Sequence, residues 1–341
     1  MKKIIIFGRS SFYHYEEAFR DALIMNKTNA IFVRLLSMAK KNSLWRKLFD
    51  FFPYINPETI LNHFHILLTV SREQPDIVLF WRPISILPVT IKALNARKVC
   101  TMTYNNDDPF NPKISALKNQ KWFFYKMILR HASHNFFYRL VNCKEATDFG
   151  SKSSSLLMSY YIPWIHYSKD DERIYDVVFI GHFEEDGREF YFEAIIKNKI
   201  KLHLYGDASW KKCKNKVIND QFNNIKAIHN QEYANFLRRT KISLCFLSKI
   251  NRDEYTRRCF EIPACGSLLV AERTDFLSSI FVEDKEAVFF STPNELVEKI
   301  DFLLKHQDII LSIAKAGKAR VVKDKFDILE VSKQIMLNYK P

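Results

Sequence analysis

The sequence has no run of eighteen apolar residues, and we therefore expect no membrane-spanning helix. Its start, MKKIIIFGRSS, carries a basic pair, but the apolar run that follows is too short for a signal peptide and is more typical of a first buried strand. The six cysteines form no C-x-x-C pair. We therefore expect reduced core cysteines in a cytoplasmic protein, and neither zinc ligands nor a disulfide framework.

Length and composition favour a two-domain protein. The 341 residues are enough for two domains, each of which can bury its own core. A hydrophobic content of 47% with 26% charged residues is typical of soluble globular proteins. The two halves of the chain show the same kind of alternation, but we find no internal repeat at a fixed period.

The positive charge is concentrated in the first half of the chain. The whole sequence carries a net charge of +14, and residues 1–150 hold 22 Lys and Arg against 11 Asp and Glu, a net charge of +11. Residues 151–341 hold 30 against 27, a net charge of +3. Such an asymmetry suggests that one domain faces an anionic surface or polymer.

In the first half, short apolar runs alternate with helical patterns. Apolar runs with little internal alternation, separated by helices, indicate a parallel sheet that is covered on both faces. The expected strands are 3–7, 30–33, 76–81, 98–104 and 135–138, and the expected helices are 14–25, 57–72, 86–95 and 115–131.

The second half restarts this alternation after a break. A Ser-rich stretch and the sequence YYIPWIHYSKDDE interrupt the pattern, as an interdomain linker does. We predict a first domain of residues 1–160, a linker 161–174, a second domain 175–326 and a C-terminal segment 327–341. Expected strands are 175–180, 201–205, 225–228, 242–246, 267–271 and 287–290, and expected helices are 189–197, 231–239, 256–264, 293–305, 307–323 and 328–338.

Residues 253–272, DEYTRRCFEIPACGSLLVAE, are the most informative stretch. Arg257, Arg258 and Glu261 are polar residues on an otherwise apolar helix that Pro263 and Gly266 close. A carboxylate one turn from two arginines suits a nucleotide-sugar site, where the carboxylate accepts hydrogen bonds from ribose hydroxyls and the arginines meet the diphosphate. The alternative for Glu261 is a helix-surface carboxylate that pairs with one of these arginines.

The same stretch carries a family resemblance. RRCFEIPACGSLLVAE, followed by FVEDKEAVFF and IAKAGKARVVKDKF, resembles the C-terminal domain of CgeB-like and group 1 glycosyltransferases of the GT-B fold. VVFIGHFEEDGREF and LHLYGDASW lie where this family has strand-loop elements. The resemblance covers about half of the chain and implies an α/β protein of two Rossmann-like domains, whose parallel sheets face a central cleft. It also implies that the final helix, in 327–341, can return to the first domain.

Further donor contacts are predicted where strands of the second domain end. Gly181 lets the backbone approach a ligand, and Arg188, at the start of the next helix, can reach the phosphates. Tyr205 and Gly206 end the following strand in a similar way, or form a plain turn. Arg258 matches the arginine that precedes Phe-Glu in the family, and such a guanidinium can stabilise the leaving diphosphate.

Three residues of the second domain have a helix cap as their alternative. The resemblance places His229 and Asn230 beside the nucleotide base, although Asn230 can equally cap the helix that follows. Asp253 lies eight residues before Glu261, and retaining members of the family carry a Glu-x7-Glu motif with its first glutamate near the transferred sugar. The aspartate, and the lack of a glycine-rich loop between the two positions, leave the stereochemistry open. Asp253 can also be an N-cap.

The first domain offers candidates for the catalytic base. His14 begins the first helix, and a histidine has a pKa close to neutrality. Asp107 and Asp108 follow the fourth strand, in a sequence that also favours a turn. This pair is not the Asp-x-Asp metal motif of the other main glycosyltransferase fold. We expect no essential metal, and no cofactor besides the nucleotide-sugar substrate.

Two stretches, 37–55 and 118–131, mix aromatic and basic residues. Both can lie on a membrane surface, with bases at anionic headgroups and aromatic rings below them, or pack on the sheet as amphipathic helices. In the first stretch the candidate bases are Lys40, Lys41, Arg46 and Lys47.

Together, these patterns and the family resemblance predict a cytoplasmic, metal-independent, hexosyltransferase-like glycosyltransferase. It would move a sugar from a nucleotide-sugar donor to a glycan or lipid-linked acceptor in bacterial cell-surface polysaccharide synthesis, for example of lipopolysaccharide. It would work at the inner face of the membrane as a peripheral protein. Transfer to DNA or protein, a non-catalytic GT-B-like sugar-nucleotide-binding protein and a sugar-nucleotide epimerase are the alternatives. A nucleic-acid partner is less favoured but remains open, because a basic face also suits DNA.

Overall fold

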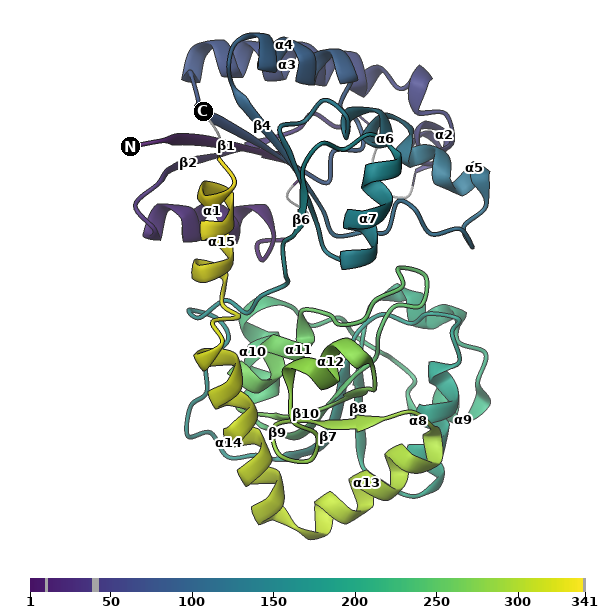
Figure 1. The fold of residues 1–341 in the computed structure, drawn as a ribbon. Helices are drawn as coiled ribbons and strands as arrows, with labels where there is room; N and C mark the ends of the chain where they lie inside the picture. Colours follow the sequence, from purple (N-terminus) through teal and green to yellow (C-terminus); the bar gives the residue numbers. More distant parts are fainter. Residues whose placement is uncertain (10–11, 39–42, 340–341) are drawn as a thin grey trace. The chain divides into compact units, whose positions relative to one another are not determined.

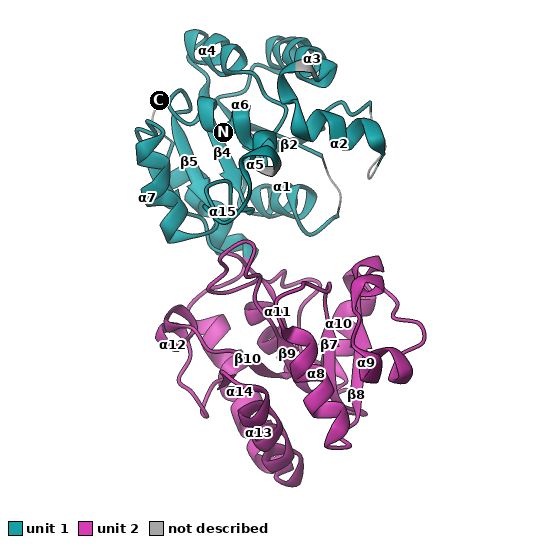
Figure 2. Cartoon of the chain, turned by 90° about the vertical axis from the view of Figure 1, so that its right-hand side faces the viewer, with its two compact units in different colours: residues 1–158, 328–341 teal, residues 159–327 magenta. Residues whose placement is uncertain are grey.

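The computed structural model describes residues 1–9, 12–38 and 43–339, in two compact units. The first unit contains residues 1–158 and 328–341, and the second contains residues 159–327 (Figure 2). The stretch 161–174, which we expect to be a linker, belongs to the second unit. Ile162 and His166 are buried there, so this stretch is packed and is not a free connection.

The first unit alternates strands and helices. Its elements are β1 (Lys3–Gly8), α1 (Glu16–Met25), β2 (Asn29–Arg34), α2 (Leu44–Phe51), η1 (Pro53–Ile55), α3 (Pro57–Glu73), β3 (Ile77–Trp81), α4 (Pro88–Ala96), β4 (Cys100–Asn105), α5 (Ala116–Asn119), η2 (Gln120–Trp122), α6 (Phe123–Ile128), β5 (His134–Phe137), α7 (Leu140–Asp148), β6 (Ser154–Leu156) and, from the C-terminus, α15 (Ile328–Leu337).

The six strands of this unit form one parallel sheet in the order β2-β1-β3-β4-β5-β6. Figure 1 shows α3 and α4 on one side of the sheet and α1 and α15 on the other. Every residue of β3 and β4 is buried, because helices cover both faces. The core on one side joins strand residues such as Phe7 and Phe80 to Ile66 of α3 and Leu94 of α4.

The C-terminal helix α15 packs on α1. The Asn26 side-chain amide, directly after α1, donates to the Leu329 carbonyl at 2.7 Å and to Ser332 Oγ at 2.9 Å. Ile328 and Ile335 of α15 are fully buried. The last helix of the chain is therefore an integral part of the first unit.

The second unit repeats this architecture. Its elements are β7 (Tyr175–Ile180), α8 (Arg188–Lys197), β8 (Leu202–Tyr205), η3 (Ala208–Lys212), α9 (Lys216–Gln221), α10 (Asn230–Arg238), β9 (Thr240–Cys245), α11 (Arg258–Ala264), β10 (Leu268–Glu272), α12 (Asp275–Ile280), β11 (Val288–Phe290), α13 (Pro293–Lys305) and α14 (Gln307–Lys323). The parallel sheet has the order β11-β10-β9-β7-β8. On one face, its strands share a core with α8, α13 and α14.

The two parallel sheets predicted from the apolar runs are confirmed, and two element predictions are wrong. Residues 225–228 form no strand. Of the four only Ile228 is buried, and a single backbone bond, from the Gly206 N–H to the Lys226 carbonyl, joins them to the end of β8. The helix predicted over 115–131 breaks into α5, η2 and α6. The 3₁₀ turn η2 brings Trp122 into the core, where only 1% of it is exposed.

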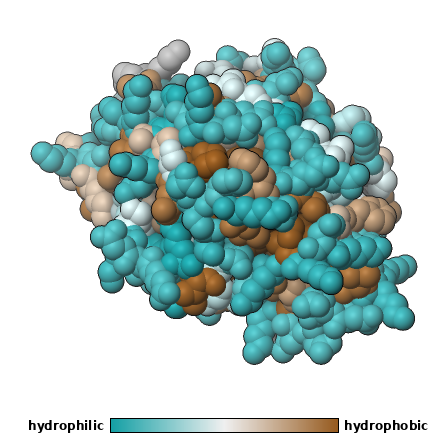
Figure 3. All heavy atoms as spheres, turned by 90° about the horizontal axis from the view of Figure 1, so that it is seen from below, coloured by the Kyte–Doolittle hydropathy of each residue, from teal (hydrophilic) through white to brown (hydrophobic). Residues whose placement is uncertain are grey.

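The surface is mainly hydrophilic on the face that Figure 3 shows, with hydrophobic atoms in separate small patches. Within the described ranges, no helix combines the length and the apolar composition that crossing a bilayer requires.

Candidate functional site

Four of the predicted donor residues meet where β7 and β8 end. The Gly181 N–H donates to the Tyr205 carbonyl at 2.9 Å. A Cβ atom on Gly181 would lie 3.2 Å from a guanidinium nitrogen of Arg258, so this arginine reaches across to the end of β7. Gly206 follows Tyr205 directly. The structure thus brings Gly181, Tyr205, Gly206 and Arg258 together at the carboxyl edge of the sheet, where open α/β sheets bind ligands.

Neither glycine leaves room for a side chain: a Cβ atom on Gly181 would lie 2.7 Å from the Phe179 ring. The Trp210 indole Nε1 donates to the Gly181 carbonyl at 2.8 Å. A Cβ atom on Gly206 would overlap both this indole nitrogen and the Gly181 carbonyl oxygen. The two strand-end loops therefore pack closely against each other, with the Trp210 ring against both of them.

Glu261 lies in a buried cluster next to this edge. Only 2% of the residue is exposed. Tyr233 of α10 donates its hydroxyl to Glu261 Oε2 at 3.0 Å, and Arg257 Nε lies 2.5 Å from Glu261 Oε1. The Glu261 carboxylate thus faces donors of the protein itself, the Tyr233 hydroxyl and the Arg257 guanidinium. Its predicted contact with ribose remains a prediction.

His166 completes the cluster. Its Nδ1 accepts a hydrogen bond from the Ile162 N–H at 3.0 Å, so the ring carries its proton on Nε2, which lies 3.7 Å from Glu261 Oε1. Burial lowers the pKa of His166 to about 4, although the Glu261 charge opposes this. The histidine is therefore neutral near pH 7 and presents an N–H to the carboxylate.

The charge on Glu261 is held by its neighbours. Burial alone would raise the pKa of this carboxyl group, but the positive charge of Arg257, with smaller contributions from His166, Arg258 and the Tyr233 hydroxyl, lowers it overall. Of the two adjacent arginines, Arg257 is thus the partner of Glu261, and Arg258 points to Gly181. This separates two residues that the sequence presents as equivalent.

Arg188 is held by the loop that precedes α8. Its Nε and NH2 donate to the two carboxylate oxygens of Asp186 at 2.8 and 2.7 Å, and its NH1 donates to the His182 carbonyl at 2.9 Å. The residue is 4% exposed. These contacts give Arg188 a role in shaping the loop after β7, and its predicted contact with phosphates remains a prediction.

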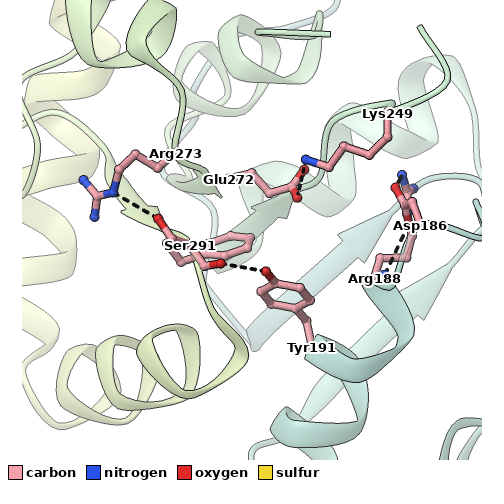
Figure 4. Close-up of a pocket in the computed structure, with 8 residues that line it drawn as sticks. Asp186, Arg188, Tyr191, Lys249, Glu272, Arg273 and Ser291 are labelled. Atoms are coloured by element: carbon pink, nitrogen blue, oxygen red, sulfur yellow. Dashed lines mark hydrogen bonds and ion pairs between the residues drawn. The ribbon is translucent and has the colours of Figure 1, made fainter. Parts of the chain in front are cut away.

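A cavity of about 230 Å³ opens at the same edge, beside the ends of β9, β10 and β11 (Figure 4). Its lining carries both signs of charge in matched pairs. Lys249 lies 2.9 Å from Glu272, and Tyr191 donates its hydroxyl to the Ser291 carbonyl at 2.9 Å. The volume is below the roughly 300–1,000 Å³ of drug-sized sites, so the cavity fits one sugar ring or one phosphate group. The lining residues are Asp186, Arg188, Tyr191, Lys249, Glu272, Arg273, Phe290 and Ser291.

The sequence reasoning missed Lys249, Glu272 and Arg273. Lys249 follows β9, and Glu272 and Arg273 stand at the end of β10. Polar residues at the carboxyl ends of successive parallel strands are the signal that points to them. Glu272 also accepts a hydrogen bond from the Leu247 N–H at 2.6 Å, so it fixes the loop that carries Lys249.

The remaining candidates of the second unit lie at loop and helix starts. His229 is the N-cap residue of α10 and is exposed, and Asn230, at φ 50°, is the first residue of this helix. The side chain of His229 makes no capping bond, and the helix cap predicted for Asn230 is wrong because Asn230 lies inside the helix. The Asp253 N–H donates to the Ser248 carbonyl at 2.9 Å. Since α11 begins at Arg258, the interpretation of Asp253 as its N-cap is wrong.

In the first unit, the three candidate bases have different surroundings. His14 lies in the turn before α1 and stacks on Phe12, with ring centroids 5.4 Å apart. Asp107 pairs with Arg82 at 2.5 Å. Asp108 is 1% exposed and accepts hydrogen bonds from the Phe110 N–H and the Asn142 amide. These contacts give Asp108 a structural role in the turn, and His14 and Asp107 remain as candidates.

In the part of the chain that the structure describes, no group of three His, Cys, Asp or Glu side chains is arranged to hold a metal ion. The metal independence of any reaction remains a prediction.

Comparison with known proteins agrees with the fold. Residues 188–334 match the model of a family described as glycosyl transferase-like. A search of curated proteins finds no sequence match to the chain.

Solved structures resemble the chain over nearly its whole length. Sucrose-phosphate synthase (tll1590) from Thermosynechococcus elongatus has a TM-score of 0.72 at 12% identity, covering 99% of this chain and 98% of that one. Anabaena Alr3699/HepE in complex with UDP and glucose has a TM-score of 0.71 at 10% identity and 98% coverage of both chains. A putative UDP-N-acetylglucosamine 2-epimerase from Listeria monocytogenes has a TM-score of 0.59 at 12% identity, covering 98% of this chain and 94% of that one.

These similarities confirm the predicted GT-B fold of two Rossmann-like units. At identities near 10% they concern the fold alone. The resemblance to CgeB-like proteins stays a prediction.

Proposed function

We propose that this protein is a glycosyltransferase that moves a sugar from a nucleotide-sugar donor to a glycan or lipid-linked acceptor. The observation that carries the proposal is the arrangement of Gly181, Gly206 and Arg258 at the carboxyl edge of the second sheet, beside a cavity of about 230 Å³. The glycosyl transferase-like match, which begins at residue 188, and the UDP and glucose bound by the HepE neighbour support it.

In this proposal Arg258 serves the diphosphate. Glycosyl transfer places negative charge on the leaving nucleoside diphosphate, and a guanidinium already in position stabilises that charge. Because Gly181 has no side chain, a phosphate can come close to the backbone at the end of β7, next to Arg258. Because this arginine can supply the positive charge, we expect activity to survive EDTA; loss that Mg²⁺ restores would contradict that expectation.

The cavity and the first unit supply the other parts of the proposal. The cavity lined by Lys249 and Glu272 takes the sugar, whose hydroxyls suit its paired donors and acceptors. Asp107 or His14 of the first unit deprotonates the acceptor hydroxyl. Asp253, in the loop after β9, is the candidate for contact with the transferred sugar.

The donor site is tested with UDP and uridine, since the HepE neighbour was solved with UDP. Arg258→Ala should weaken UDP binding by about ten- to a hundredfold, since a hydrogen bond to a charged group contributes roughly 1.5–3 kcal/mol. Uridine affinity should change little. Lys211→Ala, which removes an exposed cation of the same unit, is the matched control.

Calorimetry measures both ligands. Equal losses for UDP and uridine would make Arg258 a structural residue. Product analysis with UDP-glucose then separates the reaction classes. Transfer to an acceptor supports the proposal, whereas epimerised nucleotide sugar would favour the epimerase, and binding without turnover would favour a non-catalytic protein. Transfer to DNA or to a protein would keep the enzyme class and change the acceptor.

We further propose that the protein works at the inner face of a bacterial cell membrane, in cell-surface polysaccharide synthesis. The supporting observation is the exposed apolar surface that each of two helices of the first unit carries. Leu44 and Trp45 of α2 are 81% and 64% exposed, and Ile60, Phe64 and Leu68, spaced by four along α3, are 57%, 59% and 72% exposed. Together with the net charge of +11 in residues 1–150, this surface suits an anionic leaflet.

Only part of the basic stretch of 37–55 can take this role. Lys40 and Lys41 lie outside the described residues, and Arg46 is turned inward, 2.6 Å from Glu58, with a side chain that is 12% exposed. The inclusion of Arg46 among the headgroup contacts is therefore wrong. Lys47 and Trp45 are exposed and remain candidates.

Vesicle sedimentation tests this location. The double variant Trp45→Ala, Lys47→Glu should bind phosphatidylglycerol vesicles less than wild type at low salt, because it loses both an inserted ring and a cation. Phe302→Ala, Lys305→Glu, an exposed aromatic and cation in the second unit, is the control. If the wild-type protein ignores anionic vesicles, or the two variants behave alike, the location is wrong.

A further inference from the structure

Two arginines stand side by side at the carboxyl edge of the first sheet. β1 and β3 are parallel neighbours with Phe7 opposite Phe80, and Arg9 and Arg82 follow this pair by two residues each. Neighbouring strands lie about 4.8 Å apart. Arg9 NH2 also donates at 2.7 Å to Ser85 Oγ, three residues after Arg82. The pairing of the strands thus brings both guanidinium groups to the edge where such sheets bind ligands.

Arg9 shares its carboxylate with a second arginine. Glu58 is fully buried at the start of α3, and its Oε2 lies 3.3 Å from Arg9 NH2 while its Oε1 lies 2.6 Å from Arg46 NH2. One carboxylate therefore serves two guanidinium groups. Burial, followed by the repulsion of Arg46, lowers the pKa of Arg9 to about 10, and the attraction of Glu58 does not offset them. Arg9, Arg46 and Glu58 hold two positive charges and one negative charge. Glu16 adds a second carboxylate, whose Oε1 accepts the Arg9 N–H at 3.0 Å.

Lys121 adds a further cation beside Arg82, at the ring of Trp122. The guanidinium carbon of Arg82 lies 6.0 Å from the centre of a Trp122 ring, and Lys121 Nζ lies 5.0 Å from it. Asp107 pairs with Arg82, and burial lowers the pKa of Lys121, with Asp107 opposing and Arg82 adding to the effect. A more distant aspartate, Asp50, attracts both Arg9 and Lys121 weakly.

We propose that this edge of the first unit binds a terminal phosphate or diphosphate group of the acceptor, held chiefly by Arg9, Arg82 and Lys121. The inference rests on the proposed function, because it names the chemistry of the acceptor. Three carboxylates, Glu58, Asp107 and Glu16, adjoin the four cations of this edge, so a phosphate there adds the missing negative charge. Guanidinium groups bind a phosphate in two-pronged fashion.

The depth of the cluster favours a terminal phosphate over a nucleic-acid backbone. The side chains of Arg9 and Arg46 are only 29% and 12% exposed, whereas that of Arg82 is 45% exposed. A slender terminal group can reach recessed cations. A duplex backbone meets cations that project from the surface. Duplex DNA is therefore an outcome of the test and not the proposal.

Calorimetric titration with inorganic pyrophosphate tests the site. Arg82→Gln, the more exposed position, should weaken one pyrophosphate-binding event at least tenfold, and Arg9→Gln should do the same if it folds. Arg97→Gln makes the same charge change at an exposed arginine that caps α4, before β4 and so at the opposite edge of the sheet. This control should bind pyrophosphate as wild type does.

The donor-site variant distinguishes the two ideas. Arg258→Ala should keep the pyrophosphate binding that Arg82→Gln loses, and Arg82→Gln should keep the UDP binding that Arg258→Ala loses. If no variant binds UDP differently but Arg82→Gln still loses pyrophosphate, the proposed function fails and the anion site stands. If Arg82→Gln and Arg9→Gln bind pyrophosphate as well as Arg97→Gln does, the anion site is overturned whatever UDP does.

A second arm identifies the source of the phosphate. Neutral phosphatidylcholine vesicles with and without phosphatidic acid present a lipid phosphomonoester. Binding that depends on phosphatidic acid and falls in Arg82→Gln supports a lipid-linked acceptor, and pyrophosphate binding alone supports a water-soluble sugar phosphate. Tighter binding to duplex DNA than to pyrophosphate, lost in Arg82→Gln, would overturn the proposal in favour of a nucleic-acid surface.

Discussion

Glu58 in the first unit and Glu261 in the second are both at most 2% exposed, and their surroundings differ. Glu58 receives two arginines, Arg9 and Arg46, and the Met38 N–H at 2.8 Å. Glu261 receives one arginine, with a tyrosine hydroxyl and a neutral histidine. Glu58 can neutralise only one of its two arginines, whereas Glu261 and Arg257 neutralise each other.

This difference extends to the edges of the two sheets. At the edge of the second sheet, each cation of the cavity is paired: Lys249 with Glu272, Arg188 with Asp186 and Glu184, and Arg273 with Glu283 and Glu295. At the edge of the first sheet, three carboxylates, Glu58, Asp107 and Glu16, adjoin the four cations Arg9, Arg46, Arg82 and Lys121. The comparison teaches that the net charge of +11 in residues 1–150 is not only a property of the outer surface, because part of it converges on one place.

The largest expected effect tests the balance around Glu261. Glu261→Gln should lower the free energy of unfolding by about 3–5 kcal/mol, since it leaves Arg257 beside an uncharged group in a buried site. Urea unfolding measures the loss, and the exposed Glu254→Gln is the control. A loss below about 1 kcal/mol would mean that the cluster is open to solvent, as a site that awaits a ribose would be.

Lowering the pH should affect the Glu261 cluster, because this cluster contains a histidine, His166. The folded pKa of His166, about 4, lies below its ordinary value of 6.5. As the pH falls through 6.5, the unfolded chain takes up a proton that the folded protein refuses, so stability is lost. Between pH 7 and pH 5 this loss amounts to about 2 kcal/mol. The lowered pKa of Glu261 acts in the same direction below its ordinary value of 4.5.

Urea unfolding at the two pH values isolates this contribution. In His166→Gln the loss of stability between pH 7 and pH 5 should shrink by about 2 kcal/mol relative to wild type. His229→Gln, at an exposed histidine of the same unit, should leave it unchanged. The same pH dependence in wild type and His166→Gln would mean that the ring takes up its proton readily in the folded state.

The smallest expected effect is the difference in stability between two glycine-to-alanine variants, each at the end of a strand in one of the two units. A Cβ atom on Gly206 meets the Gly181 carbonyl and the Trp210 ring, which cannot move easily, and Gly206→Ala should cost about 1–3 kcal/mol. The atoms nearest to a Cβ atom on Gly8 belong to the side chain of Glu16, which is more adjustable than a carbonyl or an indole ring, so Gly8→Ala should cost less. Thermal unfolding of the two variants ranks them. A larger loss for Gly8→Ala would reverse this ranking and make the Glu16 side chain the more rigid neighbour.

Local sequence patterns predicted the helices and strands well where the apolar residues of a segment are the ones that the fold buries. The apolar runs of β3 and β10 and the capped starts of α3 and α13 needed no tertiary information, because Asn56 and Thr292 accept from helix N–H groups and a proline follows each of them. The strand predicted for residues 225–228 is absent because it depended on a tertiary contact that the fold does not make. Their apolar content resembles a strand, but no neighbouring strand pairs with them along their length.

The candidate site was predicted in part. The four-residue spacing of Arg257 and Glu261 indicated their pairing, and the structure has it. The spacing could not reveal His166 and Tyr233, which reach Glu261 from segments 95 and 28 residues away in the sequence. Nor could it tell that Arg188 turns to Asp186 within its own loop.

By itself, the sequence determined the two parallel sheets, the helices that cover them and the concentration of positive charge in the first half, because periodicity and composition are local properties. Only the tertiary structure decided which charges meet. Arg9 and Arg82 become neighbours because β1 pairs with β3, and Arg258 reaches Gly181 because α11 lies near the end of β7. Such contacts depend on the order of strands in a sheet, which the packing of distant apolar faces sets and no local pattern encodes.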